Sequence, residues 1–446
     1  MMSKTRRKNQ TYKNNTNKSY KYKTPHIQGK LIAEKEGWVV LQIYGDPFQR
    51  GFAHGRLLKT HIEKAKKTLY FFIKNELNTS VKNYMRIMKK YVTPVVKNEY
   101  PEFYQEITGI SKGSGHSFDV IMAWNAYLTI YSYLKDGPKQ RCSAFIATGN
   151  ATKNGDIIMA HTTHTNFADG QLCNIVLYVS PTSGYSFVMQ TQPGLISSGT
   201  DWFLSSSGII GCETTIGGIK YQPKIKNPLF CRIRQCMQYA KTFDDYVDIM
   251  RKHNGGDYPC SWLLGDTQTN EIMLFEIGQK ETHIKRTKNG FYYGMNSVIG
   301  DKMRAKEMND TDIDDILTSS GNRNARFRQL LGDIHKGNIN VENAKDIIAD
   351  HYDTNTRRQD LNTRGICRHS EFDACSKTQP NYMYGSTDAK VVNTEMAKRF
   401  SFMARFGSGC GRRFSINAHV DQNPEYKEWR QVVDDFPAFD WVDIHV

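Results

Sequence analysis

No run of apolar residues in the 446-residue sequence reaches the length of about 18 that a membrane-spanning helix needs. Three catalytic signatures are also missing: the glycine-rich phosphate loop, the Gly-x-Ser-x-Gly turn and the helical His-Glu-x-x-His pair. P-loop nucleotide-binding proteins, α/β-hydrolase serine enzymes and helical zinc proteases are therefore set aside. Hydrophobic residues still make up 39% of the chain, so we expect a soluble protein with a sizeable core.

Acidic residues are absent from residues 1–30, where nine lysines and arginines lie. This segment therefore accounts for nine of the 15 net positive charges, and the body of the chain is close to ordinary in charge. Because its Asn, Lys, Ser and Tyr residues offer little apolar surface to bury, we predict a disordered basic tail. Any contact with polyanions or an anionic membrane is expected to be weak and confined to this tail, and no specific nucleic-acid partner is expected.

A secretory signal is not visible, because the basic start is not followed by an apolar core and a small-residue cleavage site. The nine cysteines are odd in number and irregularly spaced, which favours reduced intracellular thiols, so we expect a cytoplasmic protein. Cys367-Arg368-His369, with Cys375 and Cys410, raises the question of a zinc site. This spacing matches no regular pair of zinc ligands, so neither a metal nor another cofactor is expected.

The predicted helices and strands are grouped along the chain. Residues 37–44 alternate and are rich in β-branched side chains, which predicts a strand, and residues 48–134 show helical periodicity interrupted by two prolines. From Cys142 onwards the chain changes character. Short strands are predicted at 142–148, 156–161, 173–179, 185–190, 208–215, 261–264 and 272–277, and helices near 228–252, 323–335 and 341–351. This grouping predicts an α+β fold with antiparallel sheets, divided into a helical segment, 31–141, and a core, 142–446.

Cys142 opens the first strand of the core, directly after the polar, turn-like residues 135–141. A cysteine that becomes a chain terminus has a thiol nucleophile and an α-amine of ordinary pKa about 7.7–8.0, which can serve as the base without a separate histidine. A free cysteine in a strand is more often a small buried hydrophobe, so spacing alone leaves both interpretations open.

Five short motifs, in order, resemble the phospholipase B-like family. They are Cys-Ser-Ala-Phe at 142–145, Ala-His-Thr-Thr-His at 160–164, Pro-Gly-Leu-Ile-Ser-Ser-Gly at 193–199, Glu-Thr-Thr-Ile-Gly at 213–217 and Gly-Ser-Thr-Asp-Ala-Lys-Val at 385–391. The earlier run at 45–55, Gly-Asp-Pro-Phe-Gln-Arg-Gly-Phe-Ala-His-Gly, looks more like the acyl-coenzyme A:isopenicillin N acyltransferase family. Both families belong to the cysteine N-terminal-nucleophile (Ntn) hydrolase superfamily, and the resemblance covers roughly residues 37–445.

The resemblance implies a four-layer αββα sandwich, autoproteolysis between Arg141 and Cys142, and hydrolysis or transfer of an acyl group by Cys142. The implied substrate is a small-molecule acyl compound, either a lipid-like ester or an N-acyl amide. Two alternatives stay open: an amidase or amine acyltransferase of the isopenicillin N acyltransferase type, and an inactive member that acts as a binding protein. Phospholipase B-like relatives are typically lysosomal or secreted, unlike the location expected here.

The resemblance implies two residues that would help to stabilise the oxyanion. Asn296 matches an Asn-Ser motif from which related enzymes take an oxyanion-hole or substrate amide, although an asparagine in a turn is the alternative. Thr214 lies where relatives place a second donor or a contact to the nucleophile, although packing in a strand would explain it equally well.

Two further residues are implied near the nucleophile. Arg323 matches the position at which relatives hold an arginine against the terminal cysteine, where its positive charge would favour the thiolate. The alternative is that Arg323 is a solvated arginine, in which case Arg326 or Arg328 could be the true match. His161 is expected at the end of the second core strand, where a hairpin would return it to Cys142. The chain departs from the family after His161, where Asn, Thr and Trp are expected, and at Arg141, where the acyltransferases have a small residue.

Overall fold

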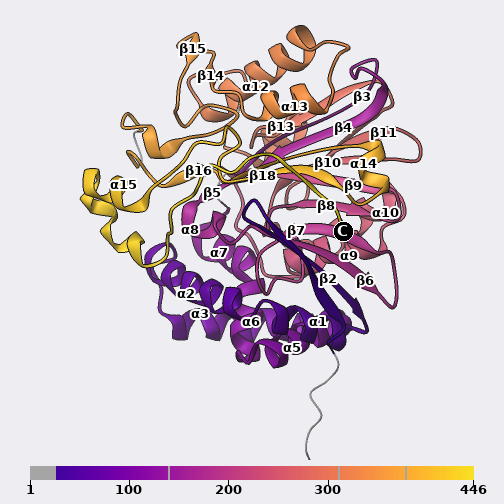
Figure 1. Ribbon diagram of the computed structural model, residues 1–446, viewed down its shortest axis with the longest axis vertical. Helices are drawn as coiled ribbons and strands as arrows, with labels where there is room; N and C mark the ends of the chain where they lie inside the picture. The colour runs from indigo at the N-terminus through magenta and orange to yellow at the C-terminus, as the bar shows by residue number, and fades with distance from the viewer. Residues whose placement is uncertain (1–26, 139–140, 310–311, 377–378) are drawn as a thin grey trace, which may run out of the picture.

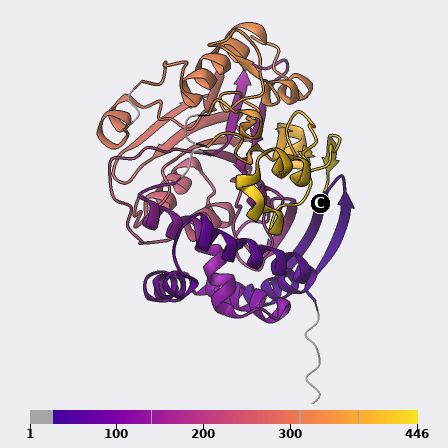
Figure 2. The same ribbon diagram turned by 90° about the vertical axis from the view of Figure 1, so that its left-hand side faces the viewer.

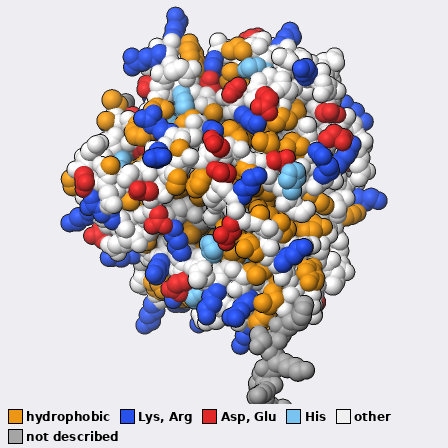
Figure 3. Space-filling model, viewed as in Figure 1, with side chains coloured by type: hydrophobic (Ala, Val, Ile, Leu, Met, Phe, Trp, Pro, Cys, Tyr) orange, Lys and Arg blue, Asp and Glu red, His pale blue; other side chains and the backbone are white. Residues whose placement is uncertain are grey.

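The computed structural model describes residues 27–138, 141–309, 312–376 and 379–446. Residues 1–26 of the predicted tail lie outside the described residues, and Gly29 and Lys30 already belong to strand β1 (Gly29–Lys35). Within the described ranges, every helix is too short or too polar to cross a bilayer. Figure 3 shows basic and acidic side chains interspersed over one face of the body.

Nine strands form the larger sheet, in the order β1-β2-β6-β7-β8-β9-β10-β11-β12. Those after β1 are β2 (Trp38–Gly45), β6 (Ile175–Pro181), β7 (Phe187–Thr191), β8 (Trp202–Ser205), β9 (Ile209–Thr215), β10 (Cys260–Asp266), β11 (Glu271–Ile277) and β12 (Thr282–Thr287). Neighbouring strands are antiparallel except β2 and β6, which run parallel with Val39 opposite Ile175. Strand β2 matches the strand predicted at 37–44, whereas β1 was not predicted, so the segment before Cys142 supplies two strands of this sheet.

Six strands form the smaller sheet, in the order β13-β3-β4-β17-β18-β19, and all its pairs are antiparallel. They are β3 (Ser143–Gly149), β4 (Gly155–Thr162), β13 (Gly290–Gly294), β17 (Asp388–Asn393), β18 (Phe402–Phe406) and β19 (Val442–Ile444). Strands β3 and β4 pack against β9 and β10 of the larger sheet. Gly265 in β10 permits this approach, since a Cβ there would lie only 3.2 Å from Ile146 and Ile157.

Helices cover the outer faces of both sheets (Figure 1). On the larger sheet, α9 (Leu229–Tyr239) packs against β8 and α10 (Phe243–Arg251) against β11. On the smaller sheet, α12 (Ser319–Gln329) and α13 (Val341–Ile348) cover a second apolar cluster that includes Phe145, Phe327 and Ile347. The sheets are thus sandwiched between helices, and the expected α+β class is confirmed.

Seven helices precede Cys142 among the described residues, in indigo to magenta in Figures 1 and 2. They are α1 (Pro47–Leu57), α2 (Lys59–Asn75), α3 (Val81–Ile87), α4 (Thr93–Glu99), α5 (Pro101–Ser114), α6 (Phe118–Asn125) and α7 (Tyr127–Lys135), with a π turn at Met88–Val92. Asp46 and Gln49 form a capping box that begins α1. Gly51 and Gly55 then let α1 approach α5 closely: a Cβ at Gly51 would lie 2.1 Å from the Glu106 carbonyl oxygen.

The remaining elements are short and lie mainly in the C-terminal half. They are α8 (Phe167–Gly170), α11 (Asp301–Glu307), α14 (Thr394–Lys398), α15 (Ile416–Gln422), the π turn Leu330–Ile334, the 3-10 turns Ser370–Phe372 and Pro424–Gln431, and two small sheets that pair β5 (His164–Asn166) with β16 (Tyr384–Ser386) and β14 (Tyr352–Asp353) with β15 (Arg358–Gln359).

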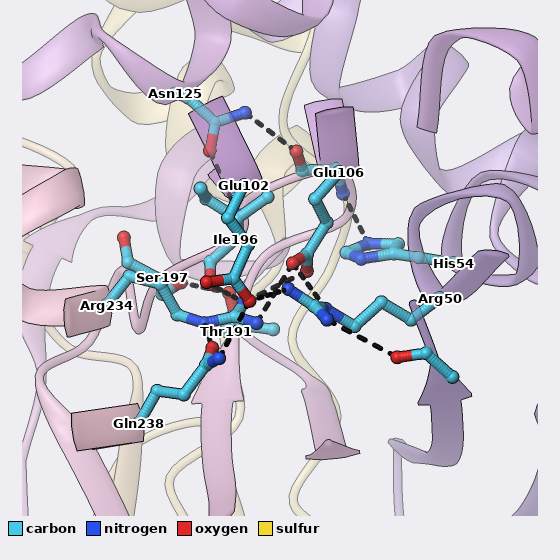
Figure 4. Close-up of polar contacts among 12 residues, drawn as sticks. Arg50, His54, Glu102, Glu106, Asn125, Thr191, Ile196, Ser197, Arg234 and Gln238 are labelled. Atoms are coloured by element: carbon cyan, nitrogen blue, oxygen red, sulfur yellow. Dashed lines mark hydrogen bonds and ion pairs between the residues drawn. The ribbon is translucent and has the colours of Figure 1, made fainter. Parts of the chain in front are cut away.

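A buried ion network joins the segment before Cys142 to the core (Figure 4). Arg50 lies 2.6 Å from Glu102 and 2.6 Å from Glu106, and Arg234 of α9 lies 2.9 Å from Glu106. Burial opposes the charge on Glu106, but Arg234 and Arg50 outweigh it and lower the pKa of this carboxyl. The two parts of the chain are therefore held by a charged contact in the interior as well as by the β2–β6 pairing.

His54 and Asn125 extend this junction to the loop 193–199, which carries one of the family motifs. The backbone N–H of Gly194 donates to His54 Nε2 (2.9 Å), and Asn125 accepts from the Ile196 N–H and donates to the Gly194 carbonyl (2.9 Å each). Burial lowers the pKa of His54 to about 4, so its ring is a neutral acceptor at physiological pH. The helices before Cys142 thus fix the shape of this loop.

Candidate active site

The carbonyl oxygen of Arg141, in the peptide bond before Cys142, accepts two hydrogen bonds. The backbone N–H of Thr215, at the end of β9, donates one over 3.2 Å. The side-chain Nδ2 of Asn296 donates the other and also donates to the Thr215 carbonyl (2.7 Å). Two N–H donors converging on one carbonyl oxygen are the arrangement that stabilises an oxyanion during acyl transfer. The fold thus brings Asn296 to the predicted cleavage site.

The backbone on both sides of this contact is strained. Cys142 has φ of 76° and Asn296 has φ of 74°, in the left-handed region that residues other than glycine rarely adopt. Such a conformation costs of order 1–3 kcal/mol and persists where surrounding contacts enforce it. The strain lies directly beside the peptide bond that would be cut.

Arg323 lies against Cys142, through the cysteine's backbone. Its Nη1 donates to the Cys142 carbonyl (2.9 Å) and to Ser143 Oγ (3.1 Å). Burial, and then the neighbouring Arg368, lower the pKa of Arg323 to about 9, which still leaves it charged at neutral pH. The alternative matches lie elsewhere: Arg326 pairs with Asp350 (2.6 Å) and Arg328 with Asp314 (2.8 Å).

The Cys142 thiol is deeply buried, with 2% of the residue exposed. Burial, and then the nearby Glu213 carboxyl, raise the pKa of this thiol well above its ordinary value, and the backbone amide of His164 opposes the shift only in part. In the continuous chain Cys142 is therefore a neutral thiol. Its activation would require a base, or the new amine that cleavage creates.

His161 lies on β4, where the β3–β4 hairpin sets it opposite Ala144. Its Nε2 lies 3.0 Å from the Glu213 carbonyl, and its ring packs beside Trp202. Burial lowers the pKa of His161 well below its ordinary value, so the ring is neutral and Nε2 donates to that carbonyl. His161 is thus held in the β3–β4 hairpin opposite Ala144, and its contact supports the end of β9.

Among the predicted site residues, Thr214 has the least direct connection to the Arg141 carbonyl. Its hydroxyl is buried and makes no hydrogen bond within the described part of the chain. It faces Gly294, where a Cβ would lie 2.3 Å from Thr214 Oγ1. The donor at the Arg141 carbonyl is instead the backbone N–H of the next residue, Thr215.

A buried pair of carboxyl groups, Asp201 and Glu213, lies beside Cys142, and neither residue was predicted from the sequence. Burial raises the pKa of Asp201 to about 6, and burial together with the Asp201 carboxyl raises the pKa of Glu213 well above its ordinary value. Two like charges in such surroundings cannot both ionise at neutral pH, so the pair retains a proton. Glu213 belongs to the Glu-Thr-Thr-Ile-Gly motif, which was the available signal; Asp201 stands in no motif.

A small, largely enclosed cavity adjoins Arg141. Apolar side chains from three parts of the chain line it, among them Trp124, Leu195 and Phe230. Arg141 is one of the lining residues and forms an ion pair with Asp169 (2.9 Å), which explains how an arginine is accommodated before Cys142. The helices before Cys142, the loop 193–199 and α9 therefore build one candidate pocket.

No family model matches this sequence. The chain is 23% identical to an uncharacterized protein of Archaeoglobus fulgidus over 53% of this chain, and 23% identical to protein dcd1A of Dictyostelium discoideum over 55% of it. It is 27% identical to the putative phospholipase B-like 3 of Caenorhabditis elegans over 34% of this chain. The matches cover 42%, 59% and 28% of these relatives, so the chain spans less than two thirds of the length of each. The name of the third relative is that of a phospholipase B-like protein, and the names of the first two state no activity.

Proposed function

We propose that this chain is the precursor of a cysteine Ntn hydrolase, cut between Arg141 and Cys142, whose freed Cys142 attacks the acyl carbon of an ester or amide. The observation that carries the proposal is the double hydrogen bond from Thr215 and Asn296 to the Arg141 carbonyl, next to a buried cysteine in a strained conformation. The layered α+β fold and the partial likeness to a phospholipase B-like protein support it.

In the proposed cleavage, the Cys142 sulfur adds to the Arg141 carbonyl carbon. The two donors stabilise the oxyanion that forms, and each such donor is commonly worth about 3–4 kcal/mol. The carbon–nitrogen bond then breaks, the thiol proton passes to the departing nitrogen, and water hydrolyses the resulting thioester. The products are a carboxylate on Arg141 and a free α-amine on Cys142.

During turnover the same groups would act on a substrate. The new amine of Cys142, with an ordinary pKa of about 7.7–8.0, takes the thiol proton. The Thr215 N–H and Asn296, released from the Arg141 carbonyl, hold the substrate oxyanion, while Arg323 fixes Cys142 through its carbonyl. The small cavity beside Arg141 would receive only the part of the acyl group next to the reacting carbon, in a lipid-like ester or an N-acyl compound.

Intact mass under denaturing conditions tests the cleavage. We expect the wild type to separate into chains that meet between Arg141 and Cys142, and Cys142→Ala to stay whole. Cys236→Ala, a buried cysteine in α9, is the matched control and should be cut normally. Cleavage of Cys142→Ala at the wild-type rate would overturn the mechanism.

Turnover is tested separately with a diacyl phospholipid, an N-acyl amino acid and a thioester donor, each with and without a thiol-blocking reagent. Thiol-dependent release from the phospholipid favours the phospholipase B-like activity, and release from the N-acyl compound favours an amidase or acyltransferase. An uncut chain that turns over none of them would favour the alternative of an inactive binding protein.

A further inference from the structure

Four metal-binding side chains converge outside the candidate active site. The ligand atoms of His351, Cys367, His369 and Cys410 all lie within 4.8 Å of one another. His369 Nε2 lies 3.5 Å from Cys367 Sγ and 3.4 Å from Cys410 Sγ. We propose that these four residues bind one Zn²⁺ ion.

The distances fit the coordination geometry of zinc. A tetrahedral ion with zinc–sulfur bonds of about 2.3 Å and zinc–nitrogen bonds of about 2.0–2.1 Å separates its sulfur and nitrogen ligands by roughly 3.5 Å. Both measured sulfur–nitrogen distances are close to this edge of the tetrahedron. Two thiolates and two imidazoles form a donor set that zinc commonly takes in structural sites.

A neighbouring carboxylate orients one of the ligands. Glu371 Oε1 lies 2.7 Å from His369 Nδ1, on the side of the ring away from the sulfurs. Such a carboxylate partner fixes the ring and leaves Nε2 to bind the ion, and it is a usual companion of histidine ligands. The cluster therefore has both an inner set of ligands and a residue that positions one of them.

Backbone hydrogen bonds hold the ligand segments together without any metal. The Cys367 N–H donates to the Asp350 carbonyl (3.0 Å), beside His351. The Gly409 N–H, beside Cys410, donates to Ser386 Oγ (3.0 Å), and the Ser386 N–H donates to the Arg368 carbonyl (2.9 Å). Because the ligands come from three segments, their spacing in the sequence matches no regular zinc motif.

The site has an entry path from the surface. Cys410 and His351 line an open hollow and are partly exposed, whereas Cys367 and His369 are buried beneath them. All four positions around the ion would be filled by protein, which indicates a structural site. The ion would tie residues 351–369, which hold only two-residue strands, to the turn after β18.

Zinc content of the purified chain, prepared in reductant and measured by plasma mass spectrometry, tests the proposal. We expect about one zinc per chain in the wild type, and a loss of most of it in Cys367→Ser and Cys410→Ser. Cys375→Ser is the matched control, because Cys375 is exposed and stands outside the cluster, so this variant should keep its zinc. Cobalt exchanged into the wild type should give the visible absorption of a tetrahedral thiolate site.

A wild-type chain without zinc, or one in which Cys367 and Cys410 form a disulfide despite reductant, would overturn the proposal. So would a Cys375→Ser variant that loses as much zinc as Cys410→Ser. If Cys367→Ser fails to fold, Glu371→Gln gives a second measurement: competition with a chelator should show affinity weakened by about 10–100-fold. An unchanged affinity in that variant would count against the proposed role of Glu371 and the site geometry.

Discussion

At the scale of single residues, the Arg141–Cys142 junction is shaped mostly by groups that hold the backbone. Thr215 contributes its backbone N–H, Arg323 donates to the Cys142 carbonyl, and Asn296 donates its side-chain amide to the Arg141 carbonyl. Backbone donors carry no constraint on residue type. The site therefore depends on where β9 ends as much as on which residues occupy it.

The first prediction concerns Asn296. Asn296→Ala should slow the appearance of the two chains by about 10²–10³-fold, because it removes one oxyanion donor. The time course of cleavage, followed by denaturing mass spectrometry, measures this. Thr214→Val is the control and should be cut at nearly the wild-type rate, since its hydroxyl makes no hydrogen bond with described residues. If cleavage were slowed equally in both variants, the Thr214 hydroxyl would have to be assigned a donor role.

The second prediction concerns Asp201. Its folded pKa of about 6 exceeds the ordinary 3.8, so it contributes stability that is complete below pH 3.8 and is lost as pH rises through about 6. Asp201→Asn, compared in the uncut Cys142→Ala chain, should therefore gain stability relative to its parent between pH 4 and 7, by roughly 2–3 kcal/mol.

Urea unfolding at several pH values measures this difference. The exposed Asp248→Asn variant is the control and should change the free energy of unfolding by less than about 0.5 kcal/mol. A constant difference between Asp201→Asn and its parent across this range would mean that Asp201 is not the titrating group.

The residues of the candidate site were predictable to different degrees. Cys142 and Asn296 stand in motifs, so their neighbours in the sequence made them candidates. Asp201 stands in no motif, and its effect comes from burial beside Glu213, which only the fold creates. His351 was missed for a similar reason: a lone histidine acquires meaning only when two other segments meet it.

At the scale of elements, the approach of α1 to α5 depends on glycine. The third prediction is that Gly51→Ala destabilises the chain by about 1–3 kcal/mol or more, because a Cβ would meet the Glu106 carbonyl at 2.1 Å. Gly332→Ala is the matched control, because its nearest contact would be an ordinary 3.8 Å. Urea unfolding of both variants decides it, and equal stabilities would show that the helices can separate at little cost.

Strands with a buried, alternating or apolar pattern were predictable from the sequence, as β2, β4 and β11 illustrate. Strand β12 was missed because its sequence, Thr-His-Ile-Lys-Arg-Thr, is polar and lies at the edge of the sheet. The parallel pairing of β2 with β6 was also missed, since the two strands are far apart in sequence and periodicity does not specify partners.

At the scale of the whole molecule, the network around Glu106 joins residues from both sides of the proposed cut. The fourth prediction is that Glu106→Gln destabilises the chain by about 3–5 kcal/mol, because Arg50 and Arg234 would lose their shared buried partner. Denaturant unfolding measures this loss. Asp434→Asn, which removes an exposed ion pair with Lys64, should cost less than about 1 kcal/mol. A similarly small cost for Glu106→Gln would show that the network does not hold the two parts together.

Because β2 and β6 lie on opposite sides of the proposed cut, their pairing also makes refolding depend on whether the chain is still continuous. While the chain is continuous, these strands find each other within one polypeptide, at the high effective concentration that a tether provides. Once cut, the two products would have to meet by diffusion after any complete unfolding, so renaturation would depend on protein concentration. The cleavage that creates the nucleophile would then also make complete unfolding effectively irreversible. A cleaved molecule that unfolds in dilute solution would rarely refold.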